Sequence, residues 1–448
     1  MDAEIGADGF EKAFEEYLHG TDGELVRTVD KEGNVIREYY SKPPVAGNNV
    51  EVTLDLKLQT VAEEALAYYI ENLRATGGID EGTGMGSDAE GGAVVALKVG
   101  TGEVLACASY PTYDLAHFRE PEYYKELNSD PLTPMFNRAL QMTQAPGSSY
   151  KMVTAVSGLE NHVIGRYTEI LTKGRYTKYD GEYGPMCLVY SRRGATHGVI
   201  NVSQALQFSC NYFFYEVGDR LTSEQLDSTA KAFGLGEPTG VELYERTGQR
   251  ANPETKKALY EGVSGNWYPG DKILAAIGQS ENRFTPMQLA SYVATIAAKG
   301  NRYACTFLSR VVSADYSTLV KEMAPQVLST VKMSEETIGA VYDGMNAVTK
   351  GGGTAVWYYM NMPGAWYQIH SDIEVCAKTG TAEHGSGGSP HGSFVCFAPM
   401  EDPEIAIAVY IQKAGQGGYG ANIANAIMDA YFSGDKASDM VTYENRVG

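Results

Sequence analysis

Five side chains in three short segments carry groups suited to acyl transfer. Ser148 is followed three residues later by Lys151. Ser209 is followed by Asn211, and Lys378 opens a Lys-Thr-Gly triplet. A serine hydroxyl is a weak nucleophile at neutral pH and needs a base within hydrogen-bond reach, which a lysine one helical turn away can supply. The series Ser-x-x-Lys, Ser-x-Asn and Lys-Thr-Gly, in this order, predicts a serine acyl transferase.

The three segments predict different roles. An amine is a base only when it is unprotonated, and burial near Lys378 and a positive helix N-terminus lowers the pKa of Lys151 in that direction. The hydroxyl of Ser209 can relay a proton to a leaving amine, and the carboxamide of Asn211 can hold a substrate peptide. Helix-like segments flank this pair, so we expect a connection between helices that turns both side chains toward one cleft.

The Lys-Thr-Gly segment predicts the substrate-binding strand. Lys378 supplies positive charge, and the hydroxyls of Thr379 and Thr381 would bind a carboxylate. Gly380 leaves room for a substrate backbone to lie alongside as an added strand. The backbone N–H groups of Ser148 and Thr381 are then natural donors to a tetrahedral oxyanion.

The first two patterns recur elsewhere, so their context decides, whereas Lys-Thr-Gly occurs once. A second Ser-x-x-Lys runs from Ser329 to Lys332, and further Ser-x-Asn triplets begin at Ser264 and Ser280. Ser148 opens an apolar run with helical spacing, which predicts one buried stripe on a helix. Ser329 lies in a strand-like stretch with no helix start. Only the first Ser-x-x-Lys therefore predicts a nucleophile and its base.

A glycine series at 415–420 imitates a dinucleotide-binding loop between a strand and a helix. Only 28 residues follow Gly420, too few for the second βαβ unit with its acidic residue. No phosphate-binding Gly-Lys-Ser/Thr loop is present, because Ala377 precedes Lys378. The sequence argues against a nucleotide enzyme.

Composition and charge exclude further classes of protein. The 448 residues are 43% apolar, and the formal charge of −20 argues against a nucleic-acid partner. No apolar stretch approaches the roughly 18 residues of a membrane helix, and no signal peptide opens the chain, so we expect a soluble chain. The six cysteines lack the paired spacing of a disulfide scaffold.

Periodicity predicts a mixed fold. A helix at 10–18 and a hairpin around 30–34 precede a long helix that starts after Asp55 and runs through Leu73. The region 148–350 is mostly helical, and a helix at 421–432 closes the pattern. Strands from both ends of the chain would form one five-stranded sheet; they are 93–99, 103–109, 373–378, 393–398 and 404–411.

With these motifs the chain resembles the class B penicillin-binding proteins, the monofunctional peptidoglycan D,D-transpeptidases, and their elongation-type branch in particular. The likeness covers 9–432 and includes further blocks, which are 91–97, 102–106, 110–114, 137–139, 239–243, 277–280 and 285–290. It implies an α/β (α+β) transpeptidase fold shared with serine β-lactamases, in which helices flank a mainly antiparallel sheet beside an all-helical subdomain. It also implies three parts of the chain. Residues 1–45 are the remnant of the N-terminal domain, or pedestal, of family members, residues 46–433 are the transpeptidase domain, and residues 434–448 are a C-terminal tail.

The resemblance also implies the reaction. Ser148 is acylated by the D-Ala-D-Ala end of a peptidoglycan stem peptide, D-alanine leaves, and the acyl group passes to an acceptor amine on a neighbouring strand. β-Lactams acylate the same serine, and no cofactor is required for the chemistry. Family members act on the extracytoplasmic face of the bacterial cytoplasmic membrane with a membrane glycan polymerase as partner, and we expect this chain to lack their membrane anchor.

A metal site is implied beside the second motif. Some elongation-type relatives carry zinc there, bound by a histidine of a His-Gly pair and by the middle residue of Ser-x-Asn, which His197 and Cys210 match. Thiolate and imidazole are ligands that zinc prefers, which adds Cys187, with Asp180 as a fourth candidate. Two buried thiols with a hydrogen-bonded histidine remain an alternative interpretation. A rival cluster is formed by three residues, His384, His391 and Cys396.

Two other functions share the motifs. A β-lactamase must hydrolyse its acyl-enzyme quickly, and the glutamate stretch 122–128 precedes Ser148 instead of following Ser209. A β-lactam sensor or an inactive scaffold would keep the fold without turnover. Intact motifs argue against a dead scaffold, and the pedestal-like N-terminus argues against a sensor.

Overall fold

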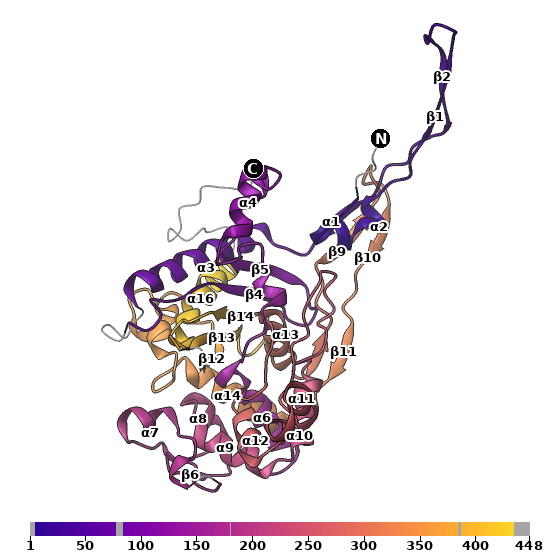
Figure 1. The fold of residues 1–448 in the computed structure, drawn as a ribbon. Helices are drawn as coiled ribbons and strands as arrows, with labels where there is room; N and C mark the ends of the chain where they lie inside the picture. The colour runs from indigo at the N-terminus through magenta and orange to yellow at the C-terminus, as the bar shows by residue number, and fades with distance from the viewer. Residues whose placement is uncertain (1–4, 78–83, 180, 384–386, 434–448) are drawn as a thin grey trace.

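A five-stranded antiparallel sheet lies at the centre of the molecule (Figure 1). The computed structural model describes residues 5–77, 84–179, 181–383 and 387–433. The strand order is β12-β13-β14-β4-β5, which joins both ends of the chain as the sequence predicts. The strands are β4 (Gly92–Lys98), β5 (Val104–Tyr110), β12 (Cys376–Ala382), β13 (His391–Ala398) and β14 (Ile405–Ile411).

The edge strand β12 differs from its expected bounds. It begins at Cys376 and continues to Ala382, because its antiparallel pairing with β13 extends to the pair Ala382 and His391. Lys378 therefore lies inside the strand, and the whole Lys-Thr-Gly-Thr segment is held by the ladder.

Helices cover both faces of the sheet. On β4, Val94 packs in a cluster with α3 (Leu56–Thr76) and α16 (Gly420–Phe432), whereas Val95 packs in a cluster with α13 (Pro286–Ala297). This alternation follows from the two-residue period of a strand. Asp55 caps α3 by accepting a hydrogen bond from the Leu58 N–H at 3.0 Å, as its sequence predicts.

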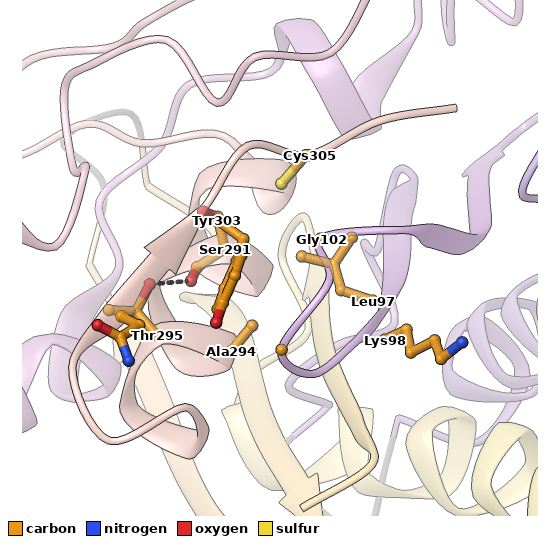
Figure 2. A pocket seen from close by; sticks show the side chains of 10 residues that line it. Leu97, Lys98, Gly102, Ser291, Ala294, Thr295, Tyr303 and Cys305 are labelled. Atoms are coloured by element: carbon orange, nitrogen blue, oxygen red, sulfur yellow. Dashed lines mark hydrogen bonds between the residues drawn. The ribbon is translucent and has the colours of Figure 1, made fainter. Parts of the chain in front are cut away.

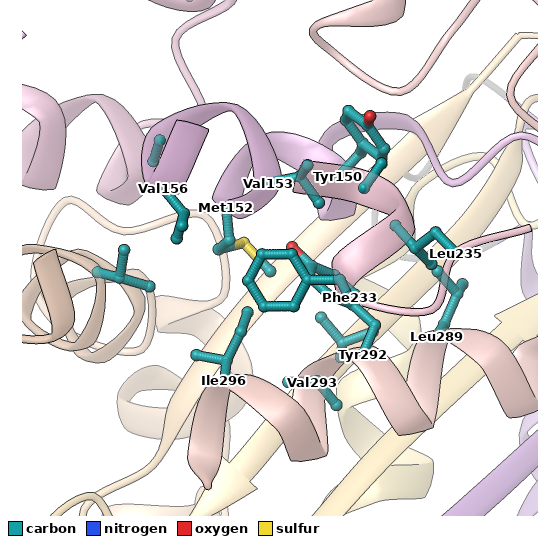
Figure 3. Packing of buried hydrophobic residues seen from close by; sticks show 14 of the residues in the cluster. Tyr150, Met152, Val153, Val156, Phe233, Leu235, Leu289, Tyr292, Val293 and Ile296 are labelled. Atoms are coloured by element: carbon teal, nitrogen blue, oxygen red, sulfur yellow. The ribbon is translucent and has the colours of Figure 1, made fainter. Parts of the chain in front are cut away.

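A mostly helical region lies at one side of the sheet (Figure 1). Its core helix, α6 (Lys151–Glu160), buries every residue from Lys151 to Leu159, whereas the sequence predicts a single buried stripe. The difference arises because α9, α10 and α14 all contact α6, and a helix surrounded on all sides is apolar on all sides. Figure 3 shows Met152 and Val156 of this helix packed with Phe233 and Ile296.

The region is not purely helical, because a short hairpin of β6 (Ile170–Thr172) and β7 (Gly198–Ile200) interrupts it. Its helices are α7 (Leu188–Arg193), α8 (Val202–Gln207), α9 (Asn211–Arg220), α10 (Ser223–Ala232), α11 (Pro253–Leu259), α12 (Pro269–Ala275) and α14 (Glu335–Val348). The remaining elements are α4 (Pro121–Ser129), α5 (Arg138–Gln141), α15 (Trp366–Ile369), η1 (Leu115–His117), η2 (Gly147–Tyr150), η3 (Gly181–Tyr183), η4 (Gly262–Gly265), η5 (Trp357–Asn361) and η6 (Gly417–Tyr419).

The N-terminal part forms a separate arm. The predicted hairpin is present as β1 (Glu24–Val29) and β2 (Val35–Lys42), and it projects away from the rest of the molecule (Figure 1). The predicted first helix is broken into α1 (Gly9–Ala13) and α2 (Glu15–Leu18) at Phe14. The backbone turns there because the Phe14 ring, 2% exposed, packs against two residues of β9, Leu308 and Val311.

Strands from the centre of the chain take part in two further small sheets. β9 (Leu308–Val312) pairs with β3 (Asn49–Val52) and with β10 (Leu319–Glu322), and β8 (Asn301–Tyr303) pairs with β11 (Val327–Thr330). Across the described ranges of the chain, no helix combines the length and the apolar character needed to cross a membrane. The expected tail at 434–448 lies outside the described residues.

Candidate active site

Ser148 lies in η2, a 3₁₀ turn that runs directly into α6. A 3₁₀ turn has three residues per turn, so Ser148 and Lys151 project from the same side. Gly147 has φ +56°, and a Cβ on it would lie 2.5 Å from the carbonyl oxygen of Thr381. Only glycine therefore allows the turn that carries Ser148 to approach the third motif this closely.

The close approach of η2 to β12 also explains why residue 380 is a glycine. A Cβ at this position would overlap Oγ of Ser393 and would lie 2.5 Å from the carbonyl oxygen of Pro146. The Ser149 hydroxyl fills the adjoining space, with its Oγ 2.8 Å from the Pro146 oxygen and 3.1 Å from Ser393 Oγ. Gly380 thus makes room for η2, and its predicted room for a substrate backbone stays a prediction.

Lys151 is fully buried, and its amine lies among polar atoms of the second motif. Nζ lies 2.8 Å from the carbonyl oxygen of Ser209, 3.3 Å from its hydroxyl and 2.6 Å from Oδ1 of Asn211. Burial lowers the pKa of Lys151 to about 8, against the opposing effect of the nearby thiols of Cys187 and Cys210. The unprotonated fraction of the amine at neutral pH is therefore far larger than that of an ordinary lysine.

The neutral amine fits these contacts. Its two hydrogens can go to the Ser209 carbonyl and to Asn211 Oδ1, which only accept, and its lone pair is then free to take a proton. Among the described residues, no hydrogen bond joins the hydroxyl of Ser148 to Lys151, although the sequence led us to expect one. Catalytic hydrogen bonds are often long without substrate and shorten when it binds.

Ser209 connects the two lysines. Its hydroxyl lies 3.3 Å from the amine of Lys151 and 2.9 Å from the amine of Lys378. Its backbone has φ +53°, a left-handed conformation that is uncommon for serine and often marks a functional site. This conformation ends α8 and redirects the chain into α9, as the expected connection between helices requires.

Lys378 has an environment that disfavours its charge. The side chain is fully buried on β12, and Nζ donates to the Ser209 hydroxyl and to the carbonyl oxygen of Thr379, each at 2.9 Å. Burial and then the charge of Lys151 hold its pKa well below the ordinary value for lysine. An incoming carboxylate would offset this, because an opposite charge favours the protonated amine.

The two threonines of the third motif point to the other face of β12. Oγ1 of Thr381 accepts from the N–H of Gly417 at 3.2 Å, and Oγ1 of Thr379 lies 2.8 Å from Oγ1 of Thr354. Thr354 and Ser393 lie outside the three motifs, although both contact the third one. The hairpin register could have indicated Ser393, which pairs with Gly380, but no local signal marks Thr354.

The sequence decoys lie elsewhere or have structural roles. Ser329 is on β11 and donates to the carbonyl oxygen of Ala232, and Lys332 is 78% exposed beside Glu160. The glycine series at 415–420 is no nucleotide loop, because a Cβ on Gly417 would overlap the carbonyl oxygen of Gly380. These glycines allow the chain to pack on β12.

Three of the four predicted metal ligands lie together. The ligand atoms of Cys187, His197 and Cys210 lie within 4.8 Å of one another. The two sulfur atoms are 3.9 Å apart, and Cys187 Sγ lies 3.8 Å from Nδ1 of His197. The hydrogen bond between Cys187 and Cys210 lowers the pKa of Cys187, which therefore ionises before its neighbour. Asp180 lies outside the described residues.

The rival cluster does not form in the described part of the chain, where only one group of three or more such ligands occurs. His391 and Cys396 are five positions apart on β13, so their side chains point to opposite faces of the sheet. Nδ1 of His391 instead accepts from the N–H of Lys413 at 3.0 Å. His384, the third member, lies outside the described residues.

Two hollows lie away from the motifs. One of about 10 Å³, between the β4–β5 turn and α13, is lined by residues including Leu97, Ser291 and Cys305 (Figure 2). It is large enough for about one water molecule. A more open one of about 380 Å³ is lined by residues including Arg246 and Arg283. Neither contains a motif residue, so the candidate site rests on the hydrogen bonds among the motifs.

Comparison with known families gives two matches that together cover most of the chain. A model described as the penicillin binding protein transpeptidase domain matches residues 92–431. A model described as the penicillin-binding protein dimerisation domain matches residues 1–52. The first match contains all three motifs, and the second contains the projecting hairpin.

Curated relatives align along nearly the whole chain. The peptidoglycan D,D-transpeptidase MrdA of Escherichia coli (strain K12) is 30% identical over 98% of this chain and 66% of its own length. MrdA of Acinetobacter baumannii is also 30% identical, over 95% of this chain and 60% of its own length. The chain thus spans slightly less than two thirds of the length of these relatives.

Solved structures share the fold. One solved structure has a TM-score of 0.80 at 27% identity, and the match covers 98% of this chain and 72% of the other. Its description is "Structural coordination of polymerization and crosslinking by a peptidoglycan synthase complex". The crystal structure of Pseudomonas aeruginosa PBP2 in complex with WCK 5153 has a TM-score of 0.76 at 25% identity, covering 96% and 85%. The predicted fold class is therefore confirmed.

Proposed function

Since the chain belongs to the class B penicillin-binding proteins, of the elongation type, we propose that it is a serine D,D-transpeptidase that cross-links the stem peptides of peptidoglycan. One observation carries the proposal. The buried amine of Lys151, with a pKa lowered to about 8, lies one 3₁₀ turn from Ser148 and within 3.3 Å of the Ser209 hydroxyl. A nucleophile, a base and a proton relay are thus assembled from two of the motifs.

Acylation uses the unprotonated amine. Ser148 Oγ attacks the carbonyl carbon of the D-Ala-D-Ala peptide bond while its proton passes to Nζ of Lys151. The tetrahedral intermediate then collapses, and the C–N bond breaks. The proton reaches the leaving amine through the Ser209 hydroxyl, which lies near both lysines. D-Alanine leaves, and an ester joins the donor peptide to Ser148.

Deacylation reverses these proton movements. The acceptor amine attacks the ester carbonyl carbon and gives up a proton to Lys151. Ser148 leaves as the alcohol when it takes that proton back, and a new peptide bond links the two stem peptides. Water in place of the amine would give hydrolysis, so this reaction depends on an acceptor positioned beside the ester.

The third motif would hold the donor peptide. β12 is the edge strand of the sheet, where an extended peptide can add as a further strand. We assign the terminal carboxylate to the hydroxyls of Thr379 and Thr381, and Lys378 supplies positive charge from the same strand. The N–H groups of Ser148 and Thr381 would stabilise the oxyanion, and removal of one such donor typically raises a barrier by about 2.7–4 kcal/mol.

Transpeptidases and β-lactamases share the acylation step, so the lifetime of the acyl-enzyme distinguishes the two functions. Incubation with penicillin followed by intact-mass measurement should show an adduct that persists for many minutes. Rapid return to the free mass would instead identify a β-lactamase. The glutamate stretch 122–128 belongs to α4, at the opposite side of the sheet from α6 and α9 in Figure 1, which disfavours rapid hydrolysis by that stretch.

Turnover separates the enzyme from a sensor or scaffold. Purified protein, with and without Ser148→Ala, is labelled with a fluorescent penicillin and is then given stem-peptide dimers or a donor with a D-amino acid acceptor. We expect labelling and exchange of the terminal D-alanine, both lost in Ser148→Ala. Labelling without exchange, even with a polymerase partner present, would indicate a β-lactam sensor or scaffold.

We also infer the cellular location of the protein and its partner from a structural relative. One structural relative is described as part of a peptidoglycan synthase complex that couples polymerization to crosslinking. By analogy the present chain works on the outer face of the bacterial cytoplasmic membrane, with a glycan polymerase in that membrane. Co-purification of the polymerase with the full-length protein tests this, and failure of the two to associate in detergent or nanodiscs would contradict it.

A structural zinc ion beside the second motif is a further part of the proposal. A tetrahedral site with Zn–S bonds of about 2.3 Å places two sulfur ligands about 3.8 Å apart, and the sulfur atoms of Cys187 and Cys210 are 3.9 Å apart. With His197 these residues would hold the metal, and Asp180 is the candidate fourth ligand. The ion would fix the loop that carries Cys187 against Cys210, the residue between Ser209 and Asn211.

Elemental analysis tests the metal site directly. We expect about one zinc per chain after gentle purification, and a chelator should lower the melting temperature. Cys187→Ser should abolish both the zinc and the chelator effect. The matched control Cys305→Ser, at a buried thiol outside this cluster, should retain both. Protein without zinc, or equal zinc content in Cys187→Ser, would exclude the site.

A further inference from the structure

The segment between α14 and η5 links the second motif to the third. It contains the run Gly351-Gly352-Gly353-Thr354. At one end, Nε2 of Gln207 donates to the carbonyl oxygen of Gly351 at 3.0 Å. A Cβ on Gly352 would lie 3.4 Å from the ring of Phe208. This end therefore packs against the two residues that precede Ser209.

The other end of the segment contacts the Lys-Thr-Gly strand. Oγ1 of Thr354 lies 2.8 Å from Oγ1 of Thr379. Thr354 is exposed, whereas Thr379 is only 9% exposed. Thr379 thus has a fixed partner at the border between the buried strand and solvent, where a substrate would approach.

The hydroxyl pair has a definite donor capacity. Each hydroxyl has one hydrogen, and one of the two is used between Thr354 and Thr379 whichever of them donates. One O–H therefore remains for an external acceptor. Thr381 can add a second, because its oxygen accepts from the N–H of Gly417 and its own hydrogen remains free. Two donors on the face of β12 that carries both threonines match the two oxygens of a carboxylate.

We infer that Thr354 is a positioning residue for recognition of the donor's carboxylate: its hydroxyl orients that of Thr379 so that the pair presents one hydrogen toward the substrate. The inference rests on the proposed function, since it assumes a substrate with a terminal carboxylate. Because the segment also packs against Gln207 and Phe208, Thr354 couples the third motif to the position of the second.

The experiment compares a charged and a neutral acylating probe. Rates of Ser148 acylation are measured with a penicillin and with its methyl ester, which lacks the carboxylate charge. We expect Thr354→Val to slow the penicillin about three- to tenfold, the range of one lost hydrogen bond, and the ester by less than twofold. Thr354→Ser keeps the hydroxyl and should restore the penicillin rate.

A matched control and two contrary results make the test decisive. Thr60→Val replaces a half-buried threonine on α3 whose hydroxyl donates to the Leu56 carbonyl oxygen, and both rates should remain unchanged. Equal slowing of both probes by Thr354→Val, or no slowing of either, would overturn the inference. If Ser148→Ala is still acylated, the proposed function fails instead, so the two failures are distinguishable.

Discussion

The amine of Lys151 lies 2.6 Å from Oδ1 of Asn211, sixty positions further along the chain. This contact joins the first motif to the second and leaves the lone pair of a neutral amine free to face other groups. Burial, not this contact, lowers the pKa of Lys151 to about 8, but a charge placed at Asn211 would act on the amine at this short distance. The reactivity of Ser148 should therefore respond to changes in this contact in a predictable direction.

Removal of the Lys151 amine should abolish efficient acylation. Lys151→Met keeps much of the buried volume but deletes the base, and a general base typically contributes about 10²- to 10⁴-fold to a rate. The penicillin acylation rate, followed by intact mass, should fall by that amount. The matched control is Lys332→Met in the second Ser-x-x-Lys, where the side chain is 78% exposed. An equal effect of both variants would contradict the assignment.

The acylation rate should rise with pH. Lys151 acts as a base only when it is deprotonated, and burial lowers its pKa to about 8. The rate should therefore be low at pH 6, increase through a midpoint near 8 and level off above it. Stopped-flow acylation by a chromogenic cephalosporin between pH 6 and 9.5 measures this. A rate that decreases across the same range would show that the protonated amine is the active form.

A negative charge at Asn211 should shift that midpoint upward. Asn211→Asp preserves shape but places a carboxylate beside the Lys151 amine, and an opposite charge at such a distance stabilises the protonated form by about one to three pKa units. The midpoint should move up accordingly, with slower acylation at pH 7.

The control for this shift is Asn201→Asp, which changes a helix cap in the same region; aspartate caps about as well as asparagine. Its midpoint should match the parent protein. An unshifted midpoint in Asn211→Asp would mean that the titrating group is not Lys151.

A methyl group at Gly380 should damage both stability and acylation. The Cβ of Gly380→Ala would overlap Ser393 Oγ and approach the carbonyl oxygen of Pro146, which must push η2 away from β12. Overpacking of this kind typically lowers the free energy of unfolding by about 1–3 kcal/mol. Chemical denaturation and the acylation rate report the two effects.

Gly270→Ala is the matched control for that variant. Gly270 lies in the first turn of α12 with nothing near its missing Cβ, so alanine should leave acylation unchanged and should not destabilise the helix. If Gly380→Ala proved as stable and as reactive as this control, the close packing of η2 on β12 would be disproved.

The sequence could predict the elements whose signals are local. Asp55 marks the start of α3, and alternating apolar residues mark the strands that assemble around β4. The bounds of β12 were harder to predict from the sequence, because its last residues are strand only through their pairing with β13. The sequence also did not predict the break between α1 and α2 at Phe14, since it depends on a hydrophobic contact with Leu308, far along the chain.

The motifs predicted the side chains of the site but not its geometry. No local pattern indicates that Ser209 adopts a left-handed backbone, because that conformation arises where α8 and α9 meet α6. The contact between Thr354 and Thr379 depends on how a loop packs after the sheet is complete. Family resemblance suggested the grouping of His197 with Cys210, and the ligand preference of zinc added Cys187, because the spacing of the three residues matches no general metal signature.

The most direct test is to locate the adduct. Protein reacted with penicillin is digested, and the modified peptide is sequenced by tandem mass spectrometry. The adduct should be on Ser148, in the peptide that includes the 3₁₀ turn beside Lys151. An adduct on Ser209, Ser280, Ser329 or any lysine, with Ser148 unmodified, would contradict the central claim that Ser148 is the nucleophile.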